Sequence, residues 1–126
     1  MNALIIDDNA NSMEVLGELL MLEGIQATHL RNPTQLNTVL EALPKIDLVF
    51  LDLEMPGMDG YSVFEALRTH EAFQSVPIVA YSVHTNQLNV ARKKGFHSFL
   101  AKPLDADQFS EQLTQILRGE HVWSVI

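Results

Sequence analysis

The sequence of 126 residues contains no cysteine, and it has only 8 Lys and Arg residues against 16 Asp and Glu residues. Without cysteine, disulfide bonds, thiolate metal sites and a cysteine nucleophile are excluded. No hydrophobic run approaches the roughly 20 residues of a membrane-spanning helix, and no basic segment precedes the first apolar run, as it would in a secretory signal. The net charge of −8 argues against direct binding to nucleic acid or to an anionic membrane. We therefore expect a cytoplasmic protein with neither of these partners.

The composition is that of one folded domain with a hydrophobic core. Hydrophobic residues make up 47% of the chain and charged residues 19%, which is unlike a disordered sequence. We expect a domain over residues 1–118, followed by a short apolar tail at 119–126. Ten of the acidic residues but only two of the basic ones lie within residues 1–60. Such an excess of carboxylates beside apolar runs is costly unless a cation or a proton neutralises it.

Short apolar runs alternate with segments of helical periodicity along the whole chain. The expected strands cover residues 4–6, 25–30, 48–51, 78–81 and 99–100, and a helix is expected after each of them. The first helix is capped by Asn9 or Asn11, and the second begins near Pro33 and continues to Pro44. The strand at 25–30 is more polar than the others, which is typical of an edge strand. The alternation predicts an α/β fold with a parallel sheet and helices on both faces.

Chemically reactive side chains follow four of the five expected strands. They are Asp7 and Asp8, Asp52, Ser82, and Lys102. Because parallel strands end at the same edge of a sheet, we expect these side chains to converge there. Three carboxylates suit a hard cation such as Mg²⁺, and a carboxylate can itself act as a nucleophile toward phosphorus. A cation, a lysine ammonium and a hydroxyl could then stabilise the phosphoryl oxygens.

Four motifs in this order resemble the receiver domain of two-component response regulators, of the stand-alone single-domain type. The resemblance runs from about residue 3 to residue 118. The motifs are Asp7-Asp8-Asn9, the segment DLEMPGMDG from Asp52 to Gly60, the segment PIVAYS from Pro77 to Ser82, and Ala101-Lys102-Pro103.

The resemblance implies a flavodoxin-like (βα)5 fold, a doubly wound five-stranded sheet with the strand order 2-1-3-4-5. It implies that Asp52 is the phosphoacceptor and that Mg²⁺ is the cofactor. Asp8 would bind the metal directly and Asp7 mainly through water, while the backbone carbonyl of Glu54 would complete the protein ligands. Ser82 and Lys102 would contact the phosphoryl group.

The resemblance also implies a signalling mechanism. Phosphorylation would draw Ser82 toward the new oxygens, and Phe99 would turn inward into the space it leaves. This would change the surface of the fourth helix, fifth strand and fifth helix, which a downstream protein target would read. The phosphodonor would be a sensor histidine kinase or a histidine phosphotransfer protein. The chain itself would not be an enzyme beyond self-assisted phosphotransfer and autodephosphorylation.

Several alternatives remain open from the sequence. The chain could be a degenerate receiver that acts as a constitutive protein-binding module, or a phosphatase of the haloacid-dehalogenase type. A homodimer could form through the same helix–strand–helix surface or through the tail. Trp123 in the tail could pack on the fifth helix or reach a second subunit. Val83, where the family has a small residue, could narrow access to Asp52, and Glu54 and His84 lie where the family tunes hydrolysis of the phosphoryl group.

Overall fold

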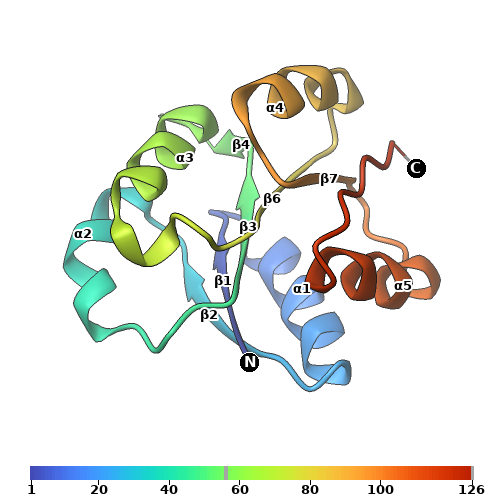
Figure 1. Cartoon of the computed structure of the whole chain (residues 1–126), viewed down its shortest axis with the longest axis horizontal. Helices are drawn as coiled ribbons and strands as arrows, with labels where there is room; N and C mark the ends of the chain where they lie inside the picture. The colour runs from blue at the N-terminus through green and yellow to red at the C-terminus, as the bar shows by residue number, and fades with distance from the viewer. Residues whose placement is uncertain (56, 126) are drawn as a thin grey trace.

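The computed structural model of the protein describes residues 1–55 and 57–125. Its centre is a five-stranded parallel sheet in the order β2-β1-β3-β6-β7 (Figure 1). The strands are β1 (Asn2–Ile6), β2 (Gln26–Leu30), β3 (Leu48–Asp52), β6 (Ile78–Ser82) and β7 (Ser98–Ala101). Counted along the chain without the small hairpin described below, this order is 2-1-3-4-5, as predicted. The polar strand β2 lies at one edge, which was also predicted.

Helices cover both faces of the sheet (Figure 1). On one face, α2, α3 and α4 enclose one cluster of buried side chains, and on the other face α1 and α5 enclose a second cluster. The helices are α1 (Ala10–Leu22), α2 (Leu36–Val39), α3 (Gly60–Thr69), α4 (Leu88–Lys94) and α5 (Ala106–Leu117), with short 3-10 turns at η1 (Pro33–Gln35), η2 (Leu40–Ala42), η3 (Glu71–Phe73) and η4 (Thr85–Gln87). No helix in the described part of the chain is both long and apolar enough to cross a bilayer.

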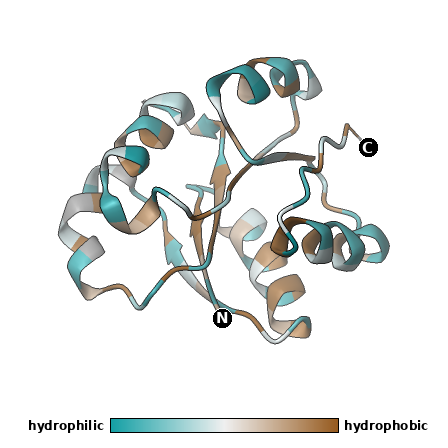
Figure 2. Cartoon of the chain, in the orientation of Figure 1, coloured by the Kyte–Doolittle hydropathy of each residue, from teal (hydrophilic) through white to brown (hydrophobic). Residues whose placement is uncertain are grey.

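Strands β3 and β6, which lie inside the sheet, are buried along their whole length. Their continuous apolar runs are required because helices cover the sheet on both sides. Figure 2 shows the hydrophobic residues gathered in these strands and in the helix sides that face them. Fully burying each large apolar side chain stabilises the fold by about 1.5–3 kcal/mol relative to leaving it exposed. This rigid centre carries Asp52 and Ser82 as the last residues of its two strands.

Local hydrogen bonds set where the three long helices begin. The side chains of Asn9, Asp59 and Asp105 each accept a hydrogen bond from a backbone N–H in the first turn of α1, α3 and α5. Asn9, rather than Asn11, is therefore the cap of the first helix. At the other end of α4, Gly95 has a φ of 105°, a left-handed conformation that favours glycine.

The second predicted helix is wrong as a continuous element. In place of one helix from Pro33 to Pro44, the chain forms η1, a four-residue α2 and η2. The side chain of Asn32 accepts hydrogen bonds from both the backbone N–H and the hydroxyl of Thr34, and Gln35 N–H donates to the Asn32 carbonyl. These bonds hold a tight turn at the start of the segment and compete with α-helical pairing.

The loop after Asp52 contains a hairpin that the sequence did not predict. Strands β4 (Glu54–Met55) and β5 (Met58–Asp59) pair antiparallel, with Glu54 opposite Asp59. Gly57, at φ 73°, supplies a left-handed residue in the turn. Pro56 of the Met-Pro-Gly motif lies outside the described residues. The hairpin holds Glu54 beside the carboxyl end of β3.

The segment after α5 lies along the free edge of β7. Phe99 N–H donates to the Val122 carbonyl at 2.8 Å, and Ser124 N–H donates to the Phe99 carbonyl at 2.9 Å. Trp123 pairs with Phe99 in a parallel bridge and packs against the α4 side of the core, while Val122 packs against the α5 side. The predicted alternative in which Trp123 packs on the fifth helix is therefore wrong. Strand-like alternation sends neighbouring side chains to opposite faces.

Candidate functional site

Three carboxylates meet at the carboxyl edge of the sheet. Asp7 and Asp8 follow β1, and Asp52 ends β3. Oxygen atoms of the three side chains lie within 4.8 Å of one another. Asp7 is fully buried, Asp52 is 2% exposed and Asp8 is half-buried. The parallel pairing of β1 with β3 brings these residues together across more than forty positions of sequence.

Lys102 lies between two of these carboxylates. Its Nζ is 3.4 Å from Asp7 Oδ2 and 3.3 Å from Asp52 Oδ2. The lysine is placed there because β7 ends at Ala101 next to the end of β6, where Lys102 N–H donates to the Ser82 carbonyl at 2.8 Å. One ammonium faces three carboxylates, so the site retains a negative excess.

Burial and the neighbouring charges shift the pKa values of Asp52 and Asp7. Burial raises the pKa of Asp52 to about 7, with a further contribution from nearby Asp7, while the N–H of Glu54 and the charge of Lys102 act against it. Burial also acts to raise the pKa of Asp7. Hydrogen bonds from Tyr81 and the Asn9 backbone, with Asp52 and Lys102, outweigh it and lower that pKa. Near neutral pH the cluster carries more negative than positive charge. A divalent cation with oxygen ligands would neutralise this excess.

Ser82 is held by a carboxylate that the sequence analysis did not name as its partner. The fully buried Ser82 hydroxyl donates to Glu54 Oε1 and accepts from the backbone N–H of His84 at 2.8 Å. The prediction assigned Glu54 a role only through its backbone carbonyl. Only the β4–β5 hairpin brings the Glu54 side chain to Ser82, so no local sequence signal marks this contact.

Phe99 is fully buried in the cluster beneath α3 and α4. Its backbone N–H and carbonyl both bond to the segment 122–124, and Trp123 packs over the same cluster. The ring is already fully buried in this structure, so the expectation that Phe99 turns inward from an exposed position is wrong for this structure, and a change in its exposure would be outward. The predicted switch aromatic is thus coupled by direct contact to the segment that follows α5.

Tyr81 is a residue of the site that the sequence motifs do not mark, since its position predicts only a strand. Its hydroxyl donates to Asp7 Oδ2 at 2.5 Å, and Lys102 Nζ lies 4.4 Å from the centre of its ring. The available signal was an aromatic residue with a polar tip, placed one position before Ser82 at the carboxyl end of a buried strand.

The acid cluster opens into a small cavity of about 350 Å³. Its lining includes Asp8, Asp52, Glu54, Val83 and Lys102. Val83 is 59% exposed and lies at the rim of this cavity, so the predicted narrowing of access to Asp52 stays a prediction.

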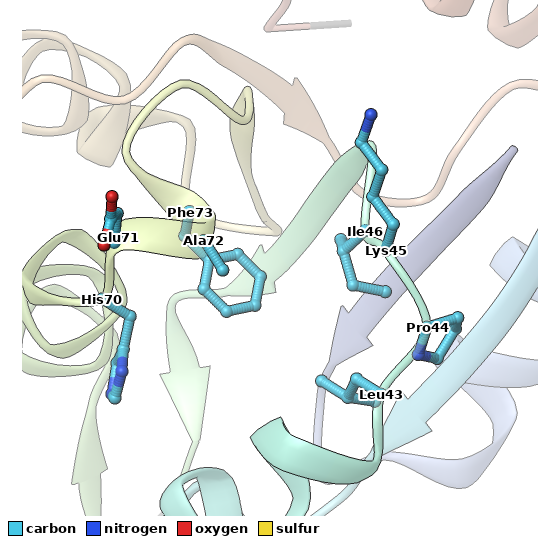
Figure 3. Close-up of a pocket in the computed structure, with 8 residues that line it drawn as sticks. All are labelled: Leu43, Pro44, Lys45, Ile46, His70, Glu71, Ala72 and Phe73. Carbon is cyan, nitrogen blue, oxygen red and sulfur yellow. The ribbon is translucent and has the colours of Figure 1, made fainter.

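A different pocket, of about 470 Å³, lies at the opposite edge of the sheet between the segment before β3 and η3. Figure 3 shows the side chains of Leu43, Ile46 and Phe73 around it, with the ammonium of Lys45 extending away. The described lining contains no cluster of acids, so the chemistry of the site stays at the carboxyl edge.

Comparison with known proteins agrees with this arrangement. Residues 3–114 match the family model of the response regulator receiver domain. Among curated relatives, protein RcaC of Microchaete diplosiphon is 29% identical over 96% of this chain and 19% of its own length. The DNA-binding response regulator MtrA of Mycolicibacterium paratuberculosis is 32% identical over 91% of this chain and 50% of its own length. The chain thus spans about half or less of these relatives.

Solved structures share the fold. A response regulator receiver domain (CheY-like) from Methylobacillus flagellatus has a TM-score of 0.80 and 28% identity, covering 92% of this chain and 98% of that one. The chemotaxis response regulator CheY4 of Vibrio cholerae has a TM-score of 0.79 at 18% identity, over 91% of this chain and 97% of that one. The match to the family model over most of the sequence, on this fold, establishes that the chain belongs to the response regulator receiver domain family.

Proposed function

We propose that the protein is a cytoplasmic phosphoacceptor switch in which Asp52 receives a phosphoryl group. The single observation that carries this proposal is the position of Lys102, 3.3 Å from Asp52 within a cluster of three carboxylates. The arrangement supplies a nucleophilic oxygen, a cation to stabilise the incoming phosphoryl oxygens and a place for a metal ion. The receiver domain would cover residues 1–118, with the segment 119–126 as an added element.

The carboxylates of Asp8 and Asp52 and the backbone carbonyl of Glu54 would hold Mg²⁺, with Asp7 acting through water. The bound ion would supply positive charge to the phosphoryl oxygens. The acidic cluster and the raised pKa of Asp52, caused first by burial, support this assignment. A sensor histidine kinase or a histidine phosphotransfer protein would be the donor.

Phosphoryl transfer then requires few protein groups. One Asp52 oxygen attacks the phosphorus of a phosphohistidine, the phosphorus–nitrogen bond breaks, and the donor imidazole leaves with the electron pair. Lys102 stays beside the new phosphoryl group and offsets its added negative charge. Ser82 must give up its hydrogen bond to Glu54 before its hydroxyl can donate to a phosphoryl oxygen.

The signal would leave the site through β6 and β7. Ser82 and Phe99 lie on the paired strands β6 and β7, with Ser82 opposite Ala101 and Phe99 opposite Ala80. Movement of Ser82 would pass to Phe99 through this pairing, and the Phe99 backbone bonds directly to the segment 122–124. Downstream proteins would read the surface formed by α4, β7 and α5. In this structure the segment 121–124 covers the β7 edge of that surface. A target protein or a second copy of the chain that bound this surface would therefore contact the segment as well.

The other candidate functions have less support. A constitutive binding module does not need Asp52, Ser82 and Lys102 within reach of one another. Phosphatases of the haloacid-dehalogenase type carry an Asp-x-Asp motif after the strand of the nucleophile. In this chain Asp52 is followed by Leu53 and Glu54 instead. We therefore propose that the chain does not turn over phosphate monoesters, which an assay with p-nitrophenyl phosphate tests.

Labelling with radioactive acetyl phosphate in the presence of Mg²⁺ tests the acceptor. The native protein should incorporate label that hydroxylamine releases, as it does from an acyl phosphate. Asp52→Asn should incorporate none, and the matched control Asp107→Asn, on α5, should behave like the native protein. Equal labelling of Asp52→Asn would refute the assignment.

A further inference from the structure

Tyr81 sits where the buried core meets the acid cluster. It is fully buried and lies beside Asp52 in the sheet, in the register that pairs β3 with β6. Its ring packs edge-on against Phe50, with 6.3 Å between ring centres, in the cluster beneath α1 and α5. The core therefore fixes the ring, and with it the position of the hydroxyl.

The hydroxyl of Tyr81 completes the hydrogen bonding of Asp7. It donates to Asp7 Oδ2 at 2.5 Å, while Asn9 N–H donates to Asp7 Oδ1 at 2.9 Å. Both oxygens of Asp7 thus receive a hydrogen bond from a rigid part of the protein. This defines the plane of the carboxylate and restricts its rotation.

The ring of Tyr81 contacts Lys102, the ammonium that faces the acid cluster. Lys102 Nζ lies 4.4 Å from the ring centre, within the range of a cation–π contact. The same nitrogen is almost equally far from Asp7 and Asp52, at 3.4 and 3.3 Å. The ring therefore lies against Lys102 at the point where its ammonium faces both carboxylates.

We infer that Tyr81 is a positioning residue of the phosphoacceptor site: its hydroxyl orients Asp7 toward the metal position, and its ring holds Lys102 between Asp7 and Asp52. This inference rests on the proposed function, because the groups that Tyr81 positions act on Mg²⁺ and on the phosphoryl group. The two halves of the side chain have separate effects. The hydroxyl acts on metal binding, and the ring acts on the group that faces the phosphoryl oxygens.

Two variants separate these effects. Tyr81→Phe removes the hydroxyl and keeps the ring, so it preserves both the core packing and the contact with Lys102. Tyr81→Met keeps an apolar side chain but removes the ring. Tyr61→Phe is the matched control, because it loses a tyrosine hydroxyl that donates to Gln87 Oε1 at 2.5 Å, outside the acid cluster. Calorimetry gives the Kd for Mg²⁺ alone and the Kd for beryllofluoride at saturating Mg²⁺, and circular dichroism gives the Tm.

Tyr81→Phe should weaken Mg²⁺ binding about tenfold, as loss of a group that orients a metal ligand does, and leave beryllofluoride binding at saturating Mg²⁺ within about twofold. Tyr81→Met should weaken beryllofluoride binding as well. A Mg²⁺ Kd for Tyr81→Phe within about threefold of the native value, with or without a lower Tm, would overturn the inference and leave the hydroxyl a purely structural role.

Tyr81→Phe decides the question even if Tyr81→Met does not fold, since it keeps the core filled. The result also separates this inference from the proposed function. Native protein that binds both Mg²⁺ and beryllofluoride, with Tyr81→Phe equal to it, overturns only the role of Tyr81. Native protein that binds neither overturns both.

Discussion

The hydroxyl of Ser82 donates a hydrogen bond to the carboxylate of Glu54, two residues beyond Asp52. This bond joins the end of β6 to the β4–β5 hairpin, and Glu54 also lines the cavity at the acid cluster. It holds the hydroxyl on a carboxylate rather than on Asp52. Under the proposed function, Ser82 must exchange this contact for one with the phosphoryl group, and the exchange has a measurable cost.

Removing the Glu54 carboxylate should therefore make the phosphorylated state easier to reach. In Glu54→Ala, the Ser82 hydroxyl has no hydrogen bond to a carboxylate that it must break. The phosphoryl group is also repelled by one fewer negative charge. We predict that beryllofluoride at saturating Mg²⁺ binds Glu54→Ala about fivefold more tightly, equivalent to about 1 kcal/mol, the typical net contribution of one hydrogen bond. Glu65→Ala, an exposed carboxylate on α3, serves as the control. Weaker binding to Glu54→Ala would show that the carboxylate assists the site.

The raised pKa of Asp52 predicts how stability depends on pH when divalent cations are absent. Burial, the largest cause, and nearby Asp7 raise this pKa from 3.8 to about 7, so between these values the folded state binds more protons than the unfolded state. The contribution of Asp52 to the free energy of unfolding must then fall as pH rises from 5 to 7, by about 2 kcal/mol. The lowered pKa of Asp7 acts below pH 3.8, outside this window.

Urea unfolding in EDTA, compared between the native protein and Asp52→Asn, isolates this effect. The difference in unfolding free energy should favour Asp52→Asn increasingly from pH 5 to 7, and Mg²⁺ should restore stability only to the native protein. If the difference in unfolding free energy between the two proteins stayed constant with pH, the raised pKa of the buried Asp52 carboxylate would be contradicted.

Trp123 should stabilise the β7 edge. Its ring packs against the core cluster that contains Phe99, and the guanidinium of Arg92 lies 4.8 Å from the ring centre. Trp123→Ala removes both contacts, so we predict a loss of about 2 kcal/mol in unfolding free energy. Val125→Ala, at an exposed position of the same segment, should change it by less than about 0.5 kcal/mol. Equal effects of the two substitutions would mean that Trp123 does not pack on the domain.

Much of this fold follows from local sequence patterns. The runs at β3 and β6 are apolar without interruption, because both faces are buried, and the acids and the lysine directly follow strands. The prediction of one continuous second helix is wrong because hydrogen bonds at Asn32 outweigh the apolar periodicity of that segment. The contacts of Glu54 and Tyr81 could not be predicted, since each depends on the position of a residue far away in sequence. The place of Trp123 depends on the free edge of β7, which only the complete sheet defines.

The most direct test of the switch uses the fluorescence of Trp123, the only tryptophan in the chain. Beryllofluoride titrated with Mg²⁺ should give a saturable change in this fluorescence, because the proposed switch passes from Asp52 through Ser82 and Phe99 to the segment that carries Trp123. Asp52→Ala should give no change, and chromatography of the same samples shows whether a dimer forms. Beryllofluoride that binds by calorimetry but leaves Trp123 unchanged would contradict the coupling to β7, and a folded native protein that does not bind it would contradict the phosphoacceptor itself.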